Sequence, residues 1–202
     1  MLLRGNDVLV CLGDSITEAA EGYVGQVANH LYVCHPETRV LVLNAGISGH
    51  RIVDLLARLD RDVIDRKPQW VTVSVGINDV WHELIPGHRG ISLPDFRTGY
   101  EELVARLKAG TQARLFLMTT TVIGEELENE PNRTLRGYNA VIRELAEREG
   151  LGLIDLNQAF QDAIRRGRAV NPVYHLTYDG VHPTPAGHHL IATHVLKALE
   201  AW

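Results

Sequence analysis

The chain has 202 residues, of which 45% are apolar, and its formal net charge is −5 at pH 7. This length predicts one domain over residues 1–202 with a full hydrophobic core, and the apolar content excludes a disordered chain. The acidic balance argues against a nucleic-acid-binding protein, which needs a basic patch or stripe.

Membrane segments and disulfides are not expected in this chain. No stretch approaches the roughly 18 consecutive apolar residues of a membrane span, and the start at Met1–Arg4 lacks the apolar core of a secretory signal. The two cysteines, Cys11 and Cys34, give neither a disulfide framework nor the spacing of metal ligands. We therefore expect a cytoplasmic protein without membrane partners.

Short apolar runs alternate with segments of helical spacing along the whole chain. Because the runs are apolar at consecutive positions, they predict strands that are covered on both faces. They are Val8–Leu12, Val40–Leu43, Trp70–Val75, Leu115–Thr119 and Leu151–Leu156. Helical spacing follows over 52–63, 96–107, 135–145 and 186–199. This alternation predicts an α/β fold with a parallel sheet and helices on both of its faces.

Polar motifs follow the first three predicted strands. Ser15 comes after the first, the segment 46–49 after the second and Asn78 after the third. Ligands of doubly wound sheets bind outside the carboxyl ends of the strands, so we expect these residues to share one cleft. Two longer irregular stretches, Ile77–Leu93 and Val122–Pro131, are predicted to be loops that line it.

Ser15 is a candidate nucleophile in the sequence Gly13-Asp14-Ser15. A turn after a parallel strand can lift this hydroxyl above the edge of the sheet. A serine hydroxyl becomes a good nucleophile only when a neighbouring base takes its proton. Taken alone, the tripeptide is better explained by Asp14 or Ser15 capping a helix.

A candidate base and its partner lie near the end of the chain, in Asp179-Gly180-Val181-His182. This spacing on one loop can bring the carboxylate beside the imidazole, where it holds the tautomer and steadies the positive charge. His188, His189 and His194 follow nearby and raise the question of a metal site, but the adjacent His188 and His189 point to different faces of a helix. We interpret these histidines as surface or core residues and expect no metal site.

Donors for an oxyanion are available at two other positions. Gly49, in Asn44-Ala45-Gly46-Ile47-Ser48-Gly49, can offer its backbone N–H, and Asn78 can offer its side-chain amide. Fixed donors of this kind stabilise charge that exists only in the transition state. Each segment alone is also compatible with an ordinary turn. The glycine spacing fits neither a dinucleotide fingerprint nor a phosphate-binding loop.

Together these motifs resemble the SGNH hydrolase family, also called GDSL, from Val8 to about Ile191. The resemblance implies a three-layer α/β/α sandwich with a five-stranded parallel sheet, similar to flavodoxin. It also implies Ser15 as nucleophile, Gly49 and Asn78 as oxyanion residues, and no cofactor. Asp179 and His182 match the other two members of the family's catalytic triad.

Two stretches, 39–49 and 67–81, look closest to a branch of bacterial carbohydrate deacetylases that includes acetylxylan esterases. In that branch Trp81 would stack on a sugar ring or close a small acyl pocket, although core packing explains it as well. The resemblance also implies a homo-oligomer. The chain departs from the branch between Ser15 and Gly22, where only residues 16–21 intervene.

The function predicted from these observations is a serine esterase that hydrolyses short-chain esters, with acetyl groups on sugars or oligosaccharides as the expected substrate. A lipid, aryl-ester or thioester acylhydrolase uses the same motifs and stays open as an alternative. A flavodoxin-like ligand-binding module is the alternative outside enzymes. It would have no use for an aspartate and a histidine three residues apart.

Overall fold

The structure is a computed structural model that describes all residues 1–202. Five parallel strands form one sheet in the order β2-β1-β3-β4-β5. The order and direction confirm the predicted doubly wound, flavodoxin-like sheet. The strands are β1 (Val8–Gly13), β2 (Leu41–Gly46), β3 (Trp70–Ser74), β4 (Arg114–Met118) and β5 (Gly152–Ile154).

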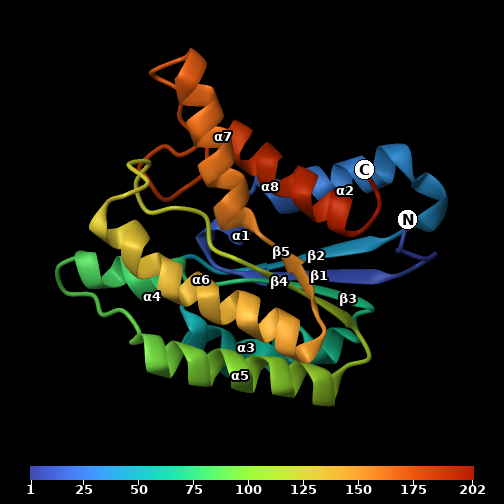
Figure 1. The fold of residues 1–202 in the computed structure, drawn as a ribbon. Helices are drawn as coiled ribbons and strands as arrows, with labels where there is room; N and C mark the ends of the chain where they lie inside the picture. Colours follow the sequence, from blue (N-terminus) through green and yellow to red (C-terminus); the bar gives the residue numbers. More distant parts are fainter.

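Helices cover both faces of this sheet, which confirms the predicted three-layer sandwich (Figure 1). One face carries α2 (Tyr23–Cys34), α7 (Leu156–Val170) and α8 (Pro185–Ala198). The other carries α3 (Ile52–Asp62), α5 (Leu93–Gly110) and α6 (Glu130–Glu149). Two short helices, α1 (Ser15–Glu18) and α4 (Ile77–Trp81), follow β1 and β3 directly.

Two sequence-based expectations need correction. The runs at β2 and β5 are predicted to be covered on both faces, but both are edge strands, and Leu41 and Leu153 are 53% and 40% exposed. The stretch Ile77–Leu93 is predicted to be irregular, but it begins with α4 and continues with a 3₁₀ turn at His82–Leu84. Such short helices contain too few turns to produce a recognisable apolar period.

The apolar side chains form one core of 50 buried residues on both sides of the sheet. Cys11 is part of this core, Cys34 is exposed at the end of α2, and both are unpaired, as the sequence predicts. None of the helices combines the length and the apolar character that a membrane crossing requires.

Strand register and the position of the chain ends determine where functional groups meet. Gly13 at the end of β1 pairs with Gly46 of β2 and with Ser74 of β3, so the three carboxyl ends lie at one edge of the sheet.

The two ends of the chain also lie close together, and the Leu2 N–H donates to the Leu199 carbonyl at 3.0 Å. The residue after α8 is thereby held to the segment that precedes β1, and α8 itself packs against α2.

Candidate active site

Ser15 is the first residue of α1, directly beyond the end of β1. Asp14 caps this helix, because its Oδ1 accepts a hydrogen bond from the Ile16 N–H at 3.0 Å. The capping explanation of the Gly13-Asp14-Ser15 turn therefore holds for Asp14. Ser15 is left free to present its hydroxyl at the sheet edge.

Ser15, His182 and Asp179 are joined by two hydrogen bonds. Ser15 Oγ lies 3.0 Å from His182 Nε2, and His182 Nδ1 lies 2.7 Å from Asp179 Oδ2. The other carboxylate oxygen, Oδ1, accepts the N–H groups of Val181 and His182 at 2.9 and 2.8 Å. Burial alone would raise the pKa of Asp179, but these hydrogen bonds outweigh it and lower that pKa below 3.8. Asp179 is thus an anion whose two oxygens are both engaged.

Gly49 and Asn78 are linked through His50, which follows Gly49 in the segment between β2 and α3. Asn78 is buried, and its Nδ2 donates one hydrogen to the His50 carbonyl at 3.0 Å, which leaves the second amide hydrogen free. Gly49 has a φ of +77°, a conformation that favours glycine, and its N–H makes no hydrogen bond within the chain. Two unsatisfied N–H donors are therefore positioned on adjacent segments.

A buried guanidinium, which no sequence motif indicates, holds these segments together. Arg58 of α3 donates to the carbonyls of Gly13 and Ala45, both at 2.8 Å, and to His50 Nδ1 at 3.0 Å. Arg58 thus connects the ends of β1 and β2 with His50, whose carbonyl accepts the Asn78 amide. The available signal was an arginine within the apolar period of a helix, between Leu55 and Leu59.

Glu125 fastens the loop that carries Asp179 and His182, and it too was not predicted. Its side chain is 7% exposed, and its Oε1 accepts the Leu176 N–H, the Thr177 N–H and the Thr177 hydroxyl at 2.7 to 2.8 Å. Arg168 donates to its Oε2 at 3.2 Å. Glu125 lies in the stretch Val122–Pro131, which the sequence predicts to line the site, but no sequence motif indicates its role.

The neighbouring Gly124 and Gly180 add a backbone contact to this fastening. The Gly124 N–H donates to the Gly180 carbonyl at 2.7 Å. Gly180 has a φ of +92°, and a Cβ there would lie 3.2 Å from the Gly124 backbone. The turn between Asp179 and His182 is therefore pressed against the segment that contains Glu125.

Trp81, at the end of α4, lies with its ring centre 5.6 Å from that of His182 in an edge-to-face arrangement. It is only partly buried and packs against the edge of the core. Both suggested roles, core packing and a wall of the cleft, are consistent with this position.

Two carboxyl groups, those of Asp14 and Asp79, are buried close to the oxyanion donors Gly49 and Asn78. Asp14 is 1% exposed, and burial raises its pKa to about 7. Asp79 is also 1% exposed, and burial together with the nearby Asp14 raises its pKa to about 7. Asp79 Oδ1 accepts the Ile52 N–H at 3.1 Å, which ties the start of α3 to α4.

The buried carboxyl of Asp79 leads to a prediction about stability and pH. Its folded-state pKa lies above the ordinary 3.8, so its stabilising contribution is complete below about pH 4 and is lost as the pH rises through about 7. Asn does not titrate. In urea unfolding, the stability of an Asp79→Asn variant relative to wild type should therefore rise from about pH 5 to pH 8.

Histidines whose pKa is lowered by burial, such as His50, act in the opposite direction, but they cancel in this comparison. Asp62→Asn is the matched control. The Arg61 guanidinium lowers the pKa of Asp62 to about 2, so its effect should not vary across this pH range. A difference between wild type and Asp79→Asn that is independent of pH would contradict the prediction.

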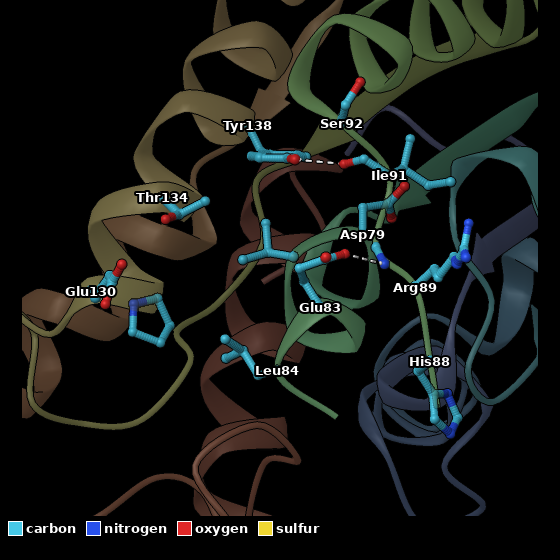
Figure 2. A pocket seen from close by; sticks show the side chains of 13 residues that line it. Asp79, Glu83, Leu84, His88, Arg89, Ile91, Ser92, Glu130, Thr134 and Tyr138 are labelled. Atoms are coloured by element: carbon cyan, nitrogen blue, oxygen red, sulfur yellow. Dashed lines mark hydrogen bonds between the residues drawn. The ribbon is translucent and has the colours of Figure 1, made fainter. Parts of the chain in front are cut away.

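Two cavities border these elements. A cavity of about 260 Å³ is lined by Ser15, His182 and His188, among others. A larger one, of about 940 Å³, lies between the segment 79–92 and α6 and contains none of the three residues Ser15, Asp179 and His182. Figure 2 shows how its walls hold that segment: Tyr138 donates to the Ile91 carbonyl at 2.6 Å, and Glu83 accepts the Gly90 N–H at 2.9 Å.

Comparison with known proteins agrees with this geometry. A model of the GDSL-like lipase/acylhydrolase family matches residues 11–190. The chain belongs to this family. This GDSL-like chain is a carboxylic ester hydrolase. It is 31% identical, over 216 aligned positions, to an acetylxylan esterase of Geobacillus stearothermophilus, and the alignment covers 98% of the chain and 96% of that relative.

Solved structures of similar proteins have the same GDSL-like fold. The acetylxylan esterase Axe2 of Geobacillus stearothermophilus matches with a TM-score of 0.88 and 29% identity, over 98% of this chain and 96% of Axe2. LAE5, an alpha/beta hydrolase from the metagenome of Lake Arreo, matches with a TM-score of 0.89 and 31% identity, over 100% and 98% of the two chains.

Proposed function

We propose that this protein removes acetyl groups from sugars or oligosaccharides, with Ser15, His182 and Asp179 as its catalytic triad. The observation that carries the proposal is the continuous hydrogen-bonded chain from Ser15 Oγ through the His182 ring to Asp179 Oδ2. This is the arrangement by which a serine hydroxyl, an imidazole and a carboxylate cooperate in acyl transfer.

Acylation begins when Ser15 Oγ attacks the ester carbonyl and His182 Nε2 takes the hydroxyl proton. Asp179 accepts the Nδ1–H of the same ring, so it fixes the tautomer and stabilises the imidazolium that forms. The negative charge on the former carbonyl oxygen is met by the N–H groups of Ser15 and Gly49 and by the Asn78 amide. His182 then donates its proton to the departing alcohol.

Deacylation repeats these steps with water as the nucleophile. His182 takes a proton from the water as it attacks the acyl carbon, and the same donors stabilise the second tetrahedral intermediate. His182 finally returns the proton to Ser15 Oγ as acetate leaves. Every proton transfer in this scheme passes through His182 Nε2.

The similar proteins support both parts of the proposal. Axe2 is an acetylxylan esterase, and its solved variants described as catalytic mutants replace a serine, an aspartate and a histidine with alanine. In Axe2 the histidine follows the aspartate by three positions, the spacing that separates His182 from Asp179 here.

Acetate release from acetylated xylo-oligosaccharides, measured beside hydrolysis of 4-nitrophenyl acetate, tests the substrate. We expect wild type to hydrolyse both and Ser15→Ala to hydrolyse neither. Activity on the nitrophenyl ester alone would overturn the sugar assignment. A series of nitrophenyl esters then tests the lipid alternative, since activity that rises beyond octanoate would contradict a preference for acetyl groups.

Asn78→Ala is expected to lower kcat for acetyl ester hydrolysis by about 10²–10³, because it removes one oxyanion donor. KM should change much less, since the donor acts on charge that is absent from the bound substrate. Steady-state kinetics on 4-nitrophenyl acetate measure both. A rise in KM at constant kcat would contradict a role in the transition state.

Glu125→Ala is expected to lower both kcat and stability, because two buried N–H groups, a hydroxyl and Arg168 lose their acceptor. An unpaired buried donor costs about 1–3 kcal/mol, so urea unfolding should show a loss of at least about 2 kcal/mol. The matched control is Glu126→Ala, since the Glu126 side chain is 89% exposed. Equal stabilities of the two variants would contradict the fastening role.

We further propose that residues 1–202 act as one domain, that the protein self-associates, and that it works in the cytoplasm. The single core supports the first statement, and the unpaired Cys11 and Cys34 fit a reducing compartment. Light scattering coupled to size-exclusion chromatography tests self-association, and a monomer at all concentrations would overturn it.

A further inference from the structure

His188 lies beside the proposed catalytic residues but takes no part in the mechanism above. It belongs to the first turns of α8, is 7% exposed, and lines the cavity of about 260 Å³ together with Ser15 and His182. A buried polar side chain at the wall of a substrate cavity needs a hydrogen-bond partner, so the direction of each ring nitrogen matters.

The tautomer of His188 is fixed by the neighbouring helix. The N–H of Tyr23, the first residue of α2, donates to His188 Nδ1 at 3.2 Å. A backbone N–H can only donate, so Nδ1 is the acceptor and a neutral ring carries its hydrogen on Nε2. Burial, with a smaller effect from His182, lowers the pKa of His188, which keeps the ring neutral at pH 7. The hydrogen bond at Nδ1 is the only one that the His188 ring makes within the chain, so Nε2–H is free to donate.

The cavity lies on the side of Ser15 where the alcohol part of an ester belongs. The departing alcohol oxygen receives its proton from His182, so that part of the substrate must lie next to the His182 ring. His182 lines this cavity, whereas Gly49 and Asn78 do not. The oxyanion therefore forms elsewhere around Ser15, and His188 borders the space for the alcohol.

We propose that His188 determines specificity by donating its Nε2–H to a hydroxyl oxygen on the alcohol part of the ester. The protein would thereby select esters of polyhydroxy alcohols over esters of simple alcohols. This inference rests on the proposed function for the position of the alcohol. A site with a fixed, buried donor discriminates against an analogue that lacks the acceptor, because the donor is then left unpaired.

The test compares glycerol 1-acetate with propyl acetate, which differ only in two hydroxyl groups. Wild type should have a kcat/KM about tenfold higher for the glycerol ester, the effect of one hydrogen bond. In His188→Asn, the side-chain oxygen can still accept the Tyr23 N–H, but no donor stands at the Nε2 position. This variant should lose the preference, whereas His188→Gln, with an amide nitrogen near that position, should keep part of it.

His189→Asn is the matched control, since His189 is exposed on the same helix and does not line the cavity. Its ratio of kcat/KM values should equal that of wild type. Equal losses on both esters in His188→Asn would overturn the inference, and so would a wild type without preference. Nitrogen-15 NMR of wild type provides a readout that needs no variant, and a proton on Nδ1 of His188 would also overturn it.

These outcomes are separable from failure of the proposed function. Hydrolysis of the simple esters without release of acetate from sugars would overturn the sugar assignment, while the comparison of the two simple esters still tests His188. Activity of the Ser15→Ala variant would instead overturn the triad.

Discussion

Replacement of Ser15 with Ala is expected to lower kcat for ester hydrolysis by on the order of 10⁴–10⁶. Ser15 Oγ is the only hydroxyl within hydrogen-bond distance of His182 Nε2, so its removal leaves the base without a nucleophile to activate. The remaining activity would come from the oxyanion donors and from substrate binding.

The fold should tolerate this change. The side chain of Ser15 makes no other hydrogen bond, and the cap of α1 is supplied by Asp14. We therefore expect thermal unfolding at the wild-type temperature beside the loss of turnover. Labelling with a fluorophosphonate, located by mass spectrometry, should modify Ser15 in wild type and no residue in the variant. A purified variant that retains most of its activity would refute the nucleophile assignment.

Asp179→Asn is expected to lower kcat by up to about 10⁴, the loss that follows when the histidine of a triad is left in the wrong tautomer. The substitution is selective. The Asn oxygen can still accept the N–H groups of Val181 and His182, so the turn stays formed while the amide nitrogen faces His182 Nδ1.

Kinetics and urea unfolding of the same preparation separate these effects. Asp179→Asn should combine a large loss of kcat with a small change in stability. Asp65→Asn is a suitable control, because Asp65 is exposed in the 3₁₀ turn Ile64–Arg66 and should leave both quantities unchanged. If Asp179→Asn lost activity only in proportion to its unfolded fraction, the orienting role would be wrong.

Local patterns were sufficient to predict the sheet. Strands such as β1 and β3 are buried on both faces and read as continuous apolar runs, and a parallel sheet needs helical crossovers that carry their own period. The edge position of β2 is not a local property, because it depends on which strands pair. The sequence therefore could not predict that β2 is partly exposed, and only the structure shows it.

The side chains that meet at the sheet edge were predictable because each follows a strand or precedes the last helix. The residues that hold these side chains in place could not be predicted in the same way. Arg58, Glu125 and His188 act through backbone groups far away in sequence, and a backbone N–H or carbonyl leaves no signature in the residue letters. The raised pKa of Asp79 has the same origin, since burial follows from packing and not from neighbouring residues.

Ser15 and His182 are separated by 167 positions, and the last helix packs against α2 near the start of the chain. No fragment made during synthesis can contain both reacting groups before almost the whole chain has been translated. Contacts between such distant residues also form late and slowly in refolding. Ester hydrolysis therefore requires a completely folded chain. Its recovery after dilution from urea should follow the slowest refolding phase rather than the first gain of secondary structure.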